Sequence, residues 1–445
     1  MNDQPKSAQV ARHPLAGKTL SGADTVVQVL ADEGVDTVFG YSGGAILPIY
    51  DAVFRYNDQH VDPDAKAPMQ LIVPANEQGA GFMAAGYARA SGRVGVVMVT
   101  SGPGATNTVT PVRDSMADSV PVVIICGQVP TNAIGTDAFQ EAPVSAIMGA
   151  VAKHVFLVTD AEMLEETIRS AFELARTGRP GPVVFDIPKD IQNWQGPFKG
   201  SGTLPLHGYR RRLAAVEGNK LTDDACERFY TMLSESERPL IYAGGGVINA
   251  NAAKPMRRFA NEYGIPVTTT LMALGASDTT HPLALHMLGM HGVASANYAV
   301  EDCDFLITVG ARFDDRVAGN PGQFAPSAKN IAHFDVDDRA VGPRELCADR
   351  SGQAETHRAH AARGQPKSRL AVVEVLRGPH LVLADAGRDD CLALRVLVDL
   401  FNDGVGLDQV GVPVVVQAVL FLEVRDLLVP LFELLAETNA PAVSE

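Results

Sequence analysis

The stretch that decides the fold is VGVVMVTSGPGATN, residues 94–107. Its first half, residues 94–100, is a continuous apolar run, which is typical of a strand buried on both faces of a sheet. A turn rich in glycine follows at 101–107 and leads into a helix. Such turns allow a ligand to approach the backbone closely, although Gly-Pro-Gly is also common in ordinary turns. The stretch therefore predicts one strand–turn–helix unit of an α/β domain.

Apolar runs on either side of this stretch predict further strands of the same parallel sheet. They lie at 37–39, 120–126 and 183–187. A periodic helix is predicted at 25–34, and a Gly-rich turn at 40–44 follows the first strand. We expect a flexible N-terminus over residues 1–20 and a first domain over residues 21–195.

A second α/β domain is predicted over residues 205–340. Strands are expected at 239–243, 266–270, 304–310 and 331–336, and a helix at 249–264. The stretch 194–212 is rich in Gly and Pro and is interpreted as a linker. The fold class is therefore α/β, with two Rossmann-like parallel-sheet domains.

The composition changes after about residue 339. Residues 340–445 contain no Ile, Met, Tyr or Trp, and Lys367 is their only lysine. They show no orderly alternation of strands, turns and helices. Two interpretations of residues 341–445 are open: an out-of-frame translation of a GC-rich gene, or a genuine alternative C-terminal module.

The composition excludes several classes of function. The chain has 445 residues, 46% hydrophobic and 20% charged, which is typical of a globular protein. A net charge of −15 argues against nucleic acid as a partner. The stretch 412–422 is too short to span a bilayer, and the polar N-terminus does not resemble a secretory signal. We expect a cytoplasmic protein that does not bind membranes.

No metal site is predicted from the cysteines or histidines. The five cysteines form no Cys-x-x-Cys pair, so buried reduced thiols are the better interpretation. His281 and His286 are five residues apart, which does not place both on one face of a helix. We expect these histidines to be solvent-facing or satisfied by hydrogen bonds.

Glu77 lies in NEQGA, residues 76–80, at the start of a predicted helix. A glutamate in the first turn of a helix usually complements the helix dipole and is solvated. Several further motifs change this interpretation. They are VFGYSGGA at 38–45, EQGA at 77–80, SGPGATN at 101–107, GTDAFQE at 135–141, GRPGP at 178–182 and IPKD at 187–190.

In this order and spacing, the motifs resemble the pyrimidine-binding domain of thiamine-diphosphate enzymes. Over residues 21–339 the chain most closely resembles the large catalytic subunit of acetolactate synthase. The resemblance implies that Glu77 hydrogen-bonds N1′ of the cofactor's aminopyrimidine and so promotes loss of the thiazolium C2 proton. It also implies that Gly44 and Gln140 line the active site, and that Lys189 lies near the substrate entrance unless it is a plain surface lysine.

The second domain resembles the flavin-binding domain of the same family. The resemblance implies FAD contacts from three motifs, GGG at 244–246, LGMHG at 288–292 and GARFDDR at 310–316. Glycines would admit the diphosphate, and arginine would offer forked donors to it. The implied flavin-binding residues are Arg179, Gly244, Gly245, Gly246, His291, Gly292, Gly310, Arg312 and Asp335.

The family resemblance also implies a reaction and partners. Two 2-ketoacids, pyruvate with pyruvate or with 2-ketobutyrate, would be condensed with decarboxylation in isoleucine and valine biosynthesis. The implied cofactors are thiamine diphosphate, FAD and Mg²⁺. A homodimer or higher oligomer is expected because the family's active site is shared between subunits, and a small regulatory subunit is a further expected partner.

The chain departs from the family pattern at three places. Ser42 stands where the family usually has Pro, and Asn76 stands where it usually has His. The Gly-Asp-Gly motif and following Asn that ligate Mg²⁺ are not found in residues 340–445. We therefore expect impaired activity. The alternatives are a non-catalytic flavin-binding or dimer-forming remnant, and another thiamine-diphosphate carboligase or decarboxylase, against which the 310–316 motif argues.

Overall fold

The computed structural model describes residues 13–60, 68–217, 223–320, 323–336, 372–376 and 380–383. The chain divides into two compact units, Met1–His207 and Gly208–Glu445. Each unit contains a wholly or mainly parallel sheet with helices packed on it. The predicted α/β class with two Rossmann-like domains is confirmed.

The first unit is built on a six-stranded parallel sheet in the order β3-β2-β4-β5-β7-β6. Its strands are β2 (Thr37–Tyr41), β3 (Gln70–Ile72), β4 (Gly95–Val99), β5 (Val122–Gln128), β6 (His154–Leu157) and β7 (Val183–Pro188). Its helices are α1 (Gly22–Asp32), α2 (Leu47–Gln59), α3 (Glu77–Ser91), α4 (Pro103–Thr106), α5 (Val109–Asp118), α6 (Val144–Gly149), α7 (Leu164–Arg176) and α8 (Lys189–Asn193), with 3₁₀ turns at η1 (Thr131–Ala133) and η2 (Ala161–Met163).

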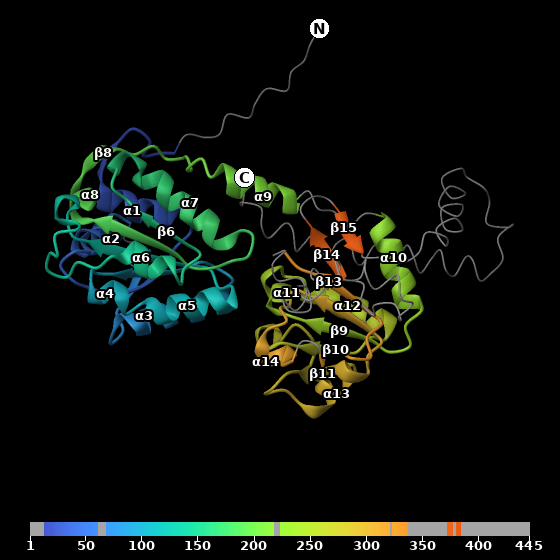
Figure 1. Ribbon diagram of the computed structural model, residues 1–445. Helices are drawn as coiled ribbons and strands as arrows, with labels where there is room; N and C mark the ends of the chain where they lie inside the picture. Colours follow the sequence, from blue (N-terminus) through green and yellow to red (C-terminus); the bar gives the residue numbers. More distant parts are fainter. Residues whose placement is uncertain are drawn as a thin grey trace, which may run out of the picture. The chain divides into compact units, whose positions relative to one another are not determined.

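Helices cover both faces of this sheet, so its central strands are mainly apolar. In Figure 1, α3 and α5 lie together on one side, and α1 and α7 lie on the other. Alanines of α3, among them Ala80 and Ala84, pack on Val97 and Val99 of β4, and all four are fully buried. Small side chains on α3 allow this helix to approach the sheet closely.

The strand order of this sheet has a switch point between β2 and β4. From β2 the chain passes to β3 on one side, and it then returns to place β4 on the other side of β2. In open α/β sheets, ligands bind outside the carboxyl ends of the strands at such a switch point. The segments at this place are 42–46 after β2 and 100–107 after β4.

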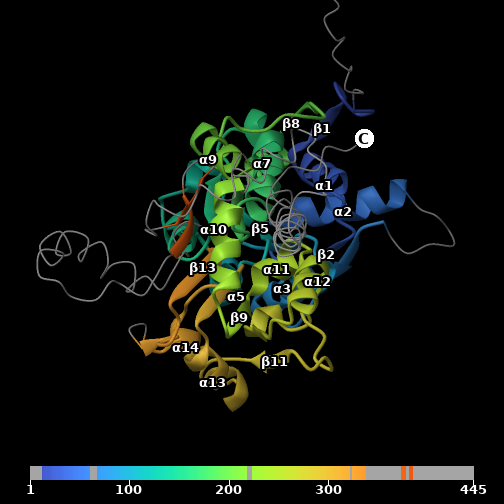
Figure 2. The ribbon, with the colours of Figure 1, turned by 90° about the vertical axis from the view of Figure 1, so that its right-hand side faces the viewer.

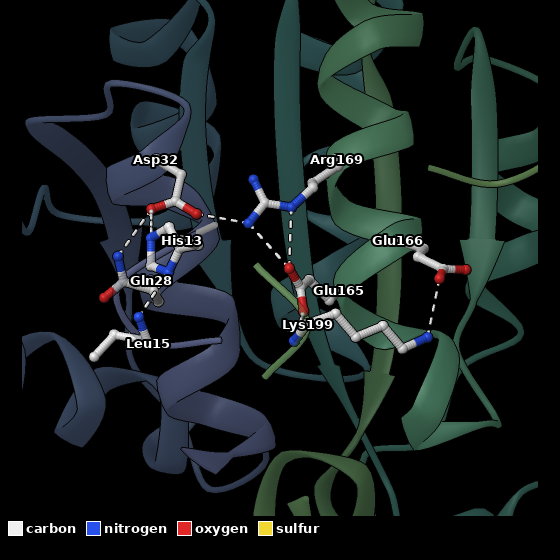
Figure 3. Close-up of polar contacts among 8 residues, drawn as sticks. All are labelled: His13, Leu15, Gln28, Asp32, Glu165, Glu166, Arg169 and Lys199. Atoms are coloured by element: carbon white, nitrogen blue, oxygen red, sulfur yellow. Dashed lines mark hydrogen bonds and ion pairs between the residues drawn. The ribbon is translucent and has the colours of Figure 1, made fainter. Parts of the chain in front are cut away.

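A polar network joins the start of the described chain to two helices. Figure 3 shows Asp32 between His13 and Arg169. Asp32 Oδ1 lies 3.2 Å from His13 Nε2, and Asp32 Oδ2 accepts a hydrogen bond from Arg169 Nη2 at 2.6 Å. Arg169 also bonds Glu165 at 3.0 Å, and Glu165 accepts the backbone N–H of Lys199 at 2.8 Å. The network therefore holds the entry and exit segments of the unit against α1 and α7.

Two sequence expectations are corrected here. The flexible N-terminus predicted for residues 1–20 extends too far, because strand β1 (Thr19–Ser21) pairs antiparallel with β8 (Gln195–Pro197). The first 12 residues lie outside the described residues. The predicted linker at 194–212 contains β8 and the start of α9 (His207–Glu217), and the division between the two units falls after His207.

The second unit has a seven-stranded sheet in the order β11-β10-β9-β12-β13-β14-β15. The strands are β9 (Pro239–Ala243), β10 (Val267–Thr269), β11 (Ala284–Met287), β12 (Phe305–Val309), β13 (Asn330–Phe334), β14 (Val372–Leu376) and β15 (His380–Leu383). All adjacent pairs are parallel except β14 with β15. The further elements are α10 (Asp223–Ser234), α11 (Gly245–Asn249), α12 (Ala253–Tyr263), α13 (Ala294–Asp302), α14 (Asp315–Ala318) and η3 (Leu271–Ala273).

The second unit buries one apolar layer on each face of its sheet. One layer joins α10, α11 and α12 to the strands and contains Phe229, Phe259 and Phe305. The other joins α13 to the opposite face through Ala296 and Val300. In Figure 2, α13 and α14 lie below α10 and α12.

Strands β14 and β15 lie in the region where no orderly alternation of elements was expected. The remainder of residues 341–445 lies outside the described residues, so both interpretations of the tail stay hypotheses. Within the described part of the chain, no helix has the length and apolarity needed to cross a membrane.

Candidate functional site

Glu77 is the first residue of α3, and its side chain is buried, with 8% of its surface exposed. The preceding residue explains this. Asn76 caps the helix, and its Oδ1 accepts the N–H of Gly79 at 2.7 Å. Glu77 Oε2 accepts a hydrogen bond from Asn107 Nδ2 at 2.9 Å. The carboxylate is therefore held inside the fold, and the usual solvated role of a first-turn glutamate does not apply.

The loops after β2 and β4 meet beside Glu77. The N–H of Ala45 bonds Thr100 Oγ1 at 3.3 Å. A Cβ atom on Gly43 would lie 2.5 Å from Thr100 Cγ2, and one on Gly104 would lie 2.7 Å from the same atom and 3.5 Å from Glu77 Oε1. A Cβ on Gly44 would meet no atom within 4 Å. The glycines thus allow the loops to pack closely, and Gly44 faces open space.

The segment 135–141 packs against the turn that follows β4. A Cβ on Gly102 would lie 2.5 Å from the carbonyl oxygen of Gln140, so only glycine fits there. Gln140 itself has a positive φ of 61°. The carboxylate of Glu141 accepts the N–H groups of Gly135 and Ala138, which lowers the pKa of Glu141. The structure therefore brings the backbone of Gln140 to the loop that carries Asn107.

The second unit has its own switch point between β9 and β12. The chain runs from β9 through β10 to β11 and then returns to place β12 on the other side of β9. At the carboxyl ends of these two strands, the N–H of Gly246 bonds the carbonyl of Gly310 at 2.9 Å. Cβ atoms on Gly244 and Gly246 would lie 2.1 Å from Gly310 O and 2.7 Å from Gly310 Cα. These glycines are needed for contact between two loops.

Large apolar side chains are exposed around this second switch point. They are Ile248 at 39%, Leu271 at 66%, Leu274 at 52%, Met290 at 64% and Val293 at 42% exposure. The loops at 288–292 and 310–316 are joined by the N–H of Met290, which bonds the carbonyl of Arg316 at 2.8 Å. Apolar surface beside arginine-bearing loops fits a flat, anionic cofactor.

Comparison with known proteins finds one family match within each unit. Residues 20–147 match the thiamine pyrophosphate enzyme N-terminal TPP binding domain, and residues 226–349 match the thiamine pyrophosphate enzyme central domain. Both units therefore contain domains of the thiamine pyrophosphate enzyme family.

Sequence relatives of the chain confirm the resemblance to acetolactate synthase. The acetolactate synthase large subunit of Corynebacterium glutamicum is 44% identical over 343 residues, which cover 77% of this chain and 52% of the relative. The mitochondrial catalytic subunit of Saccharomyces cerevisiae is 43% identical over 333 residues, which cover 72% of this chain and 47% of the relative. The chain spans about half the length of the relatives it matches.

Residues proposed to contact the flavin lie at several places. Gly292 and His291 follow β11, and Asp335 follows β13. Arg179 lies in the first unit, where its guanidinium donates to Ser119 Oγ at 2.9 Å and to the carbonyl of Met116 at 3.1 Å. The two units are described separately, so the role of Arg179 toward the second unit stays a prediction.

Several buried polar residues near these loops were missed by the sequence interpretation. Asp186 on β7 is 2% exposed, and its Oδ2 accepts Gln128 Nε2 at 2.9 Å. Gln128 also donates to the carbonyl of Ala142 at 3.2 Å, directly after the 135–141 segment. Burial raises the pKa of Asp186 to about 7. A single Asp within an apolar run could have signalled this site, but its partners are far away in sequence.

No metal centre is found in the part of the chain that the structure describes. Its His, Cys, Asp and Glu residues form no group of three or more that could hold an ion. The described residues therefore offer no cluster of ligands for Mg²⁺.

Proposed function

We propose that this chain is an acetolactate synthase by descent, a transferase that joins two 2-ketoacids with loss of carbon dioxide in branched-chain amino-acid biosynthesis. The substrates would be pyruvate with pyruvate, or pyruvate with 2-ketobutyrate. The observation that carries the proposal is the buried carboxylate of Glu77, held by Asn107 at 2.9 Å at the switch point of the first unit.

Thiamine diphosphate, when bound, supplies a carbon nucleophile that adds to the 2-keto carbonyl. Glu77 would hydrogen-bond N1′ of the aminopyrimidine and share a proton with it. Its burial excludes water, which strengthens that hydrogen bond. Gly44 leaves room for the ligand beside the carboxylate, and Gln140 would line the same space. No step is assigned to Mg²⁺.

The second unit would bind FAD. Support comes from the switch point between β9 and β12, the exposed apolar side chains around it and the arginines of the 310–316 loop. In this proposal Arg312 and the loop backbone bind the diphosphate, while Gly292 and His291 lie against the ring system. The homodimer, the small regulatory subunit and a cytoplasmic location are further parts of the proposal that follow from the family resemblance.

The test is exchange of the C2 proton of thiamine diphosphate in D₂O, followed by NMR, together with acetolactate formation from pyruvate. The purified full chain is used with thiamine diphosphate, Mg²⁺ and FAD. We expect exchange above the buffer rate, low turnover, and loss of both in Glu77→Gln. Glu162→Gln is the matched control, because Glu162 is exposed on η2. Equal exchange in wild type and Glu77→Gln would refute the role of Glu77.

A second candidate function is a non-catalytic flavin-binding remnant. The observation that favours it is the absence of the family's Gly-Asp-Gly motif from residues 340–445 of the sequence. Stoichiometric FAD binding without C2 exchange or acetolactate formation would identify the remnant. FAD binding with Glu77-dependent exchange would identify the enzyme.

A further inference from the structure

Three consecutive carbonyl groups begin the loop after β12, and each is held by a different element. The carbonyl of Gly310 accepts a backbone N–H of α11 at 2.9 Å. The carbonyl of Ala311 lies 2.8 Å from His333 Nε2, and that of Arg312 accepts Tyr242 Oη–H at 2.8 Å. Because a carbonyl oxygen only accepts, His333 carries its proton on Nε2.

The two side-chain donors come from the strands that flank β12. Tyr242 on β9 and His333 on β13 are both opposite Thr308 of β12, so the three residues form one row across the sheet. Tyr242 and His333 are fully buried. The ring of Phe313 packs between them, with centroids at 5.8 Å from Tyr242 and 5.2 Å from His333. Packing therefore fixes both donors in place.

This arrangement determines where the N–H groups of the loop point. In a trans peptide the N–H points opposite to its carbonyl, and no peptide bond of the described chain is cis. The N–H groups of Ala311, Arg312 and Phe313 therefore point away from the groups that hold the carbonyls. Among the described residues these N–H groups have no acceptor. Successive N–H groups that lack an acceptor within the protein can donate to a bound anion.

The charges beside this surface are mixed. Arg312 belongs to the loop itself, and Arg316 follows it. Asp314 is occupied as the cap of α14, since its carboxylate accepts the N–H of Arg316 at 3.2 Å. Asp315 lies 3.8 Å from the Arg316 guanidinium and is largely exposed. Asp314 is thus engaged by a backbone N–H, and Asp315 lies beside a guanidinium.

We propose that Tyr242 and His333 are positioning residues that turn the N–H groups of residues 311–313 outward to bind the diphosphate of a dinucleotide cofactor. The inference rests on the proposed flavin binding. It assigns a function to two buried polar side chains that touch no ligand themselves. It also predicts that their removal weakens binding of the diphosphate and leaves binding of the flavin ring unchanged.

The experiment measures dissociation constants of FAD and of riboflavin, which lacks the diphosphate, by quenching of flavin fluorescence with the full chain. The readout is the ratio of the two constants. Loss of one hydrogen bond that orders the loop corresponds to a fivefold to tenfold change, about 1 kcal/mol. We expect Tyr242→Phe and His333→Leu to weaken FAD binding by about this factor, while riboflavin binding is unchanged. The side-chain amide of glutamine can donate a hydrogen bond, so His333→Gln should bring the ratio of the two constants part of the way back to the wild-type value.

Tyr298→Phe is the matched control, because Tyr298 is 65% exposed on α13. If wild type binds no FAD, the proposed flavin function fails, and this inference fails with it. If wild type binds FAD but the ratio is unchanged in Tyr242→Phe and His333→Leu, only the inference is overturned. Equal weakening of FAD and riboflavin would assign the two residues a purely structural role and would also overturn it.

Discussion

Asn107 Nδ2 donates a hydrogen bond to Glu77 Oε2 over 2.9 Å, across 30 residues of sequence. One carboxylate oxygen is therefore occupied by a neutral donor from the loop after β4. The other, Oε1, lies beside Gly104, where a Cβ would approach it only to 3.5 Å. The carboxylate thus has a fixed orientation, with Oε1 beside the turn at Gly104.

The first prediction concerns Asn107→Ala. It removes the donor that orients Glu77 and should slow C2-proton exchange of thiamine diphosphate by about fivefold, since Asn107 is exposed and the bond contributes about 1 kcal/mol. NMR in D₂O measures the rate. Asn261→Ala, an exposed change on α12, is the control. An exchange rate equal to that of the control would show that Asn107 does not orient the carboxylate.

The second prediction compares two adjacent glycines. A Cβ on Gly43 would lie 2.5 Å from Thr100 Cγ2, whereas a Cβ on Gly44 would meet no atom within 4 Å. Gly43→Ala should destabilise the first unit by about 1–3 kcal/mol through overpacking. Gly44→Ala should leave stability unchanged and weaken thiamine-diphosphate binding. Urea denaturation followed by fluorescence of Trp194, the single tryptophan, measures the first unit. Equal stability of both variants would contradict the assigned packing.

The strands predicted from sequence were those with apolar residues on both faces. Val and Ile fill β4, β5 and β7, and helices cover both sides of these strands. Among the strands that were missed, β3, β6 and β11 lie at sheet edges and have partly exposed side chains. An edge strand needs no continuous apolar run, so a search for such runs does not find it.

The candidate site was predicted in part. Glu77 was identified from its motif, but nothing in a single sequence shows that Asn76 takes over the cap and that the glutamate is buried. Tyr242 and His333 each resemble ordinary strand residues. Their common action on one loop depends on the register of three strands, which local patterns do not specify.

The third prediction concerns Asp186, whose pKa is raised by burial to about 7. At a pH between the ordinary aspartate pKa of about 3.9 and this value, Asp186 is ionised in the unfolded chain and protonated in the folded unit. The free energy of unfolding should therefore fall with rising pH, by up to about 1.4 kcal/mol per unit. In Asp186→Asn this slope should disappear. Trp194 fluorescence in urea at pH 5 to 8 measures it, with exposed Asp58→Asn as control. A slope unchanged in Asp186→Asn would contradict the prediction.

The last prediction concerns His333, and its sign is opposite. Burial lowers the pKa of His333 to about 4. At a pH between this value and the ordinary histidine pKa of about 6.5, His333 is protonated in the unfolded chain but neutral in the folded unit. The free energy of unfolding should therefore rise with pH. Acidification from pH 6.5 to 4.5 should then destabilise the second unit, while the same change stabilises the first through Asp186.

Hydrogen exchange followed by mass spectrometry separates the two units, because peptides of β9 and β12 report on the second and peptides of β5 and β7 on the first. The exchange rates are corrected for the intrinsic effect of pH. On acidification, the peptides of the second unit should lose protection and those of the first unit should gain it. His333→Gln should abolish the loss in the second unit only, because glutamine donates without titrating. If protection in the second unit is still lost in His333→Gln, another group causes the acid sensitivity. If the peptides of both units change in the same direction, the opposite signs assigned to Asp186 and His333 are wrong.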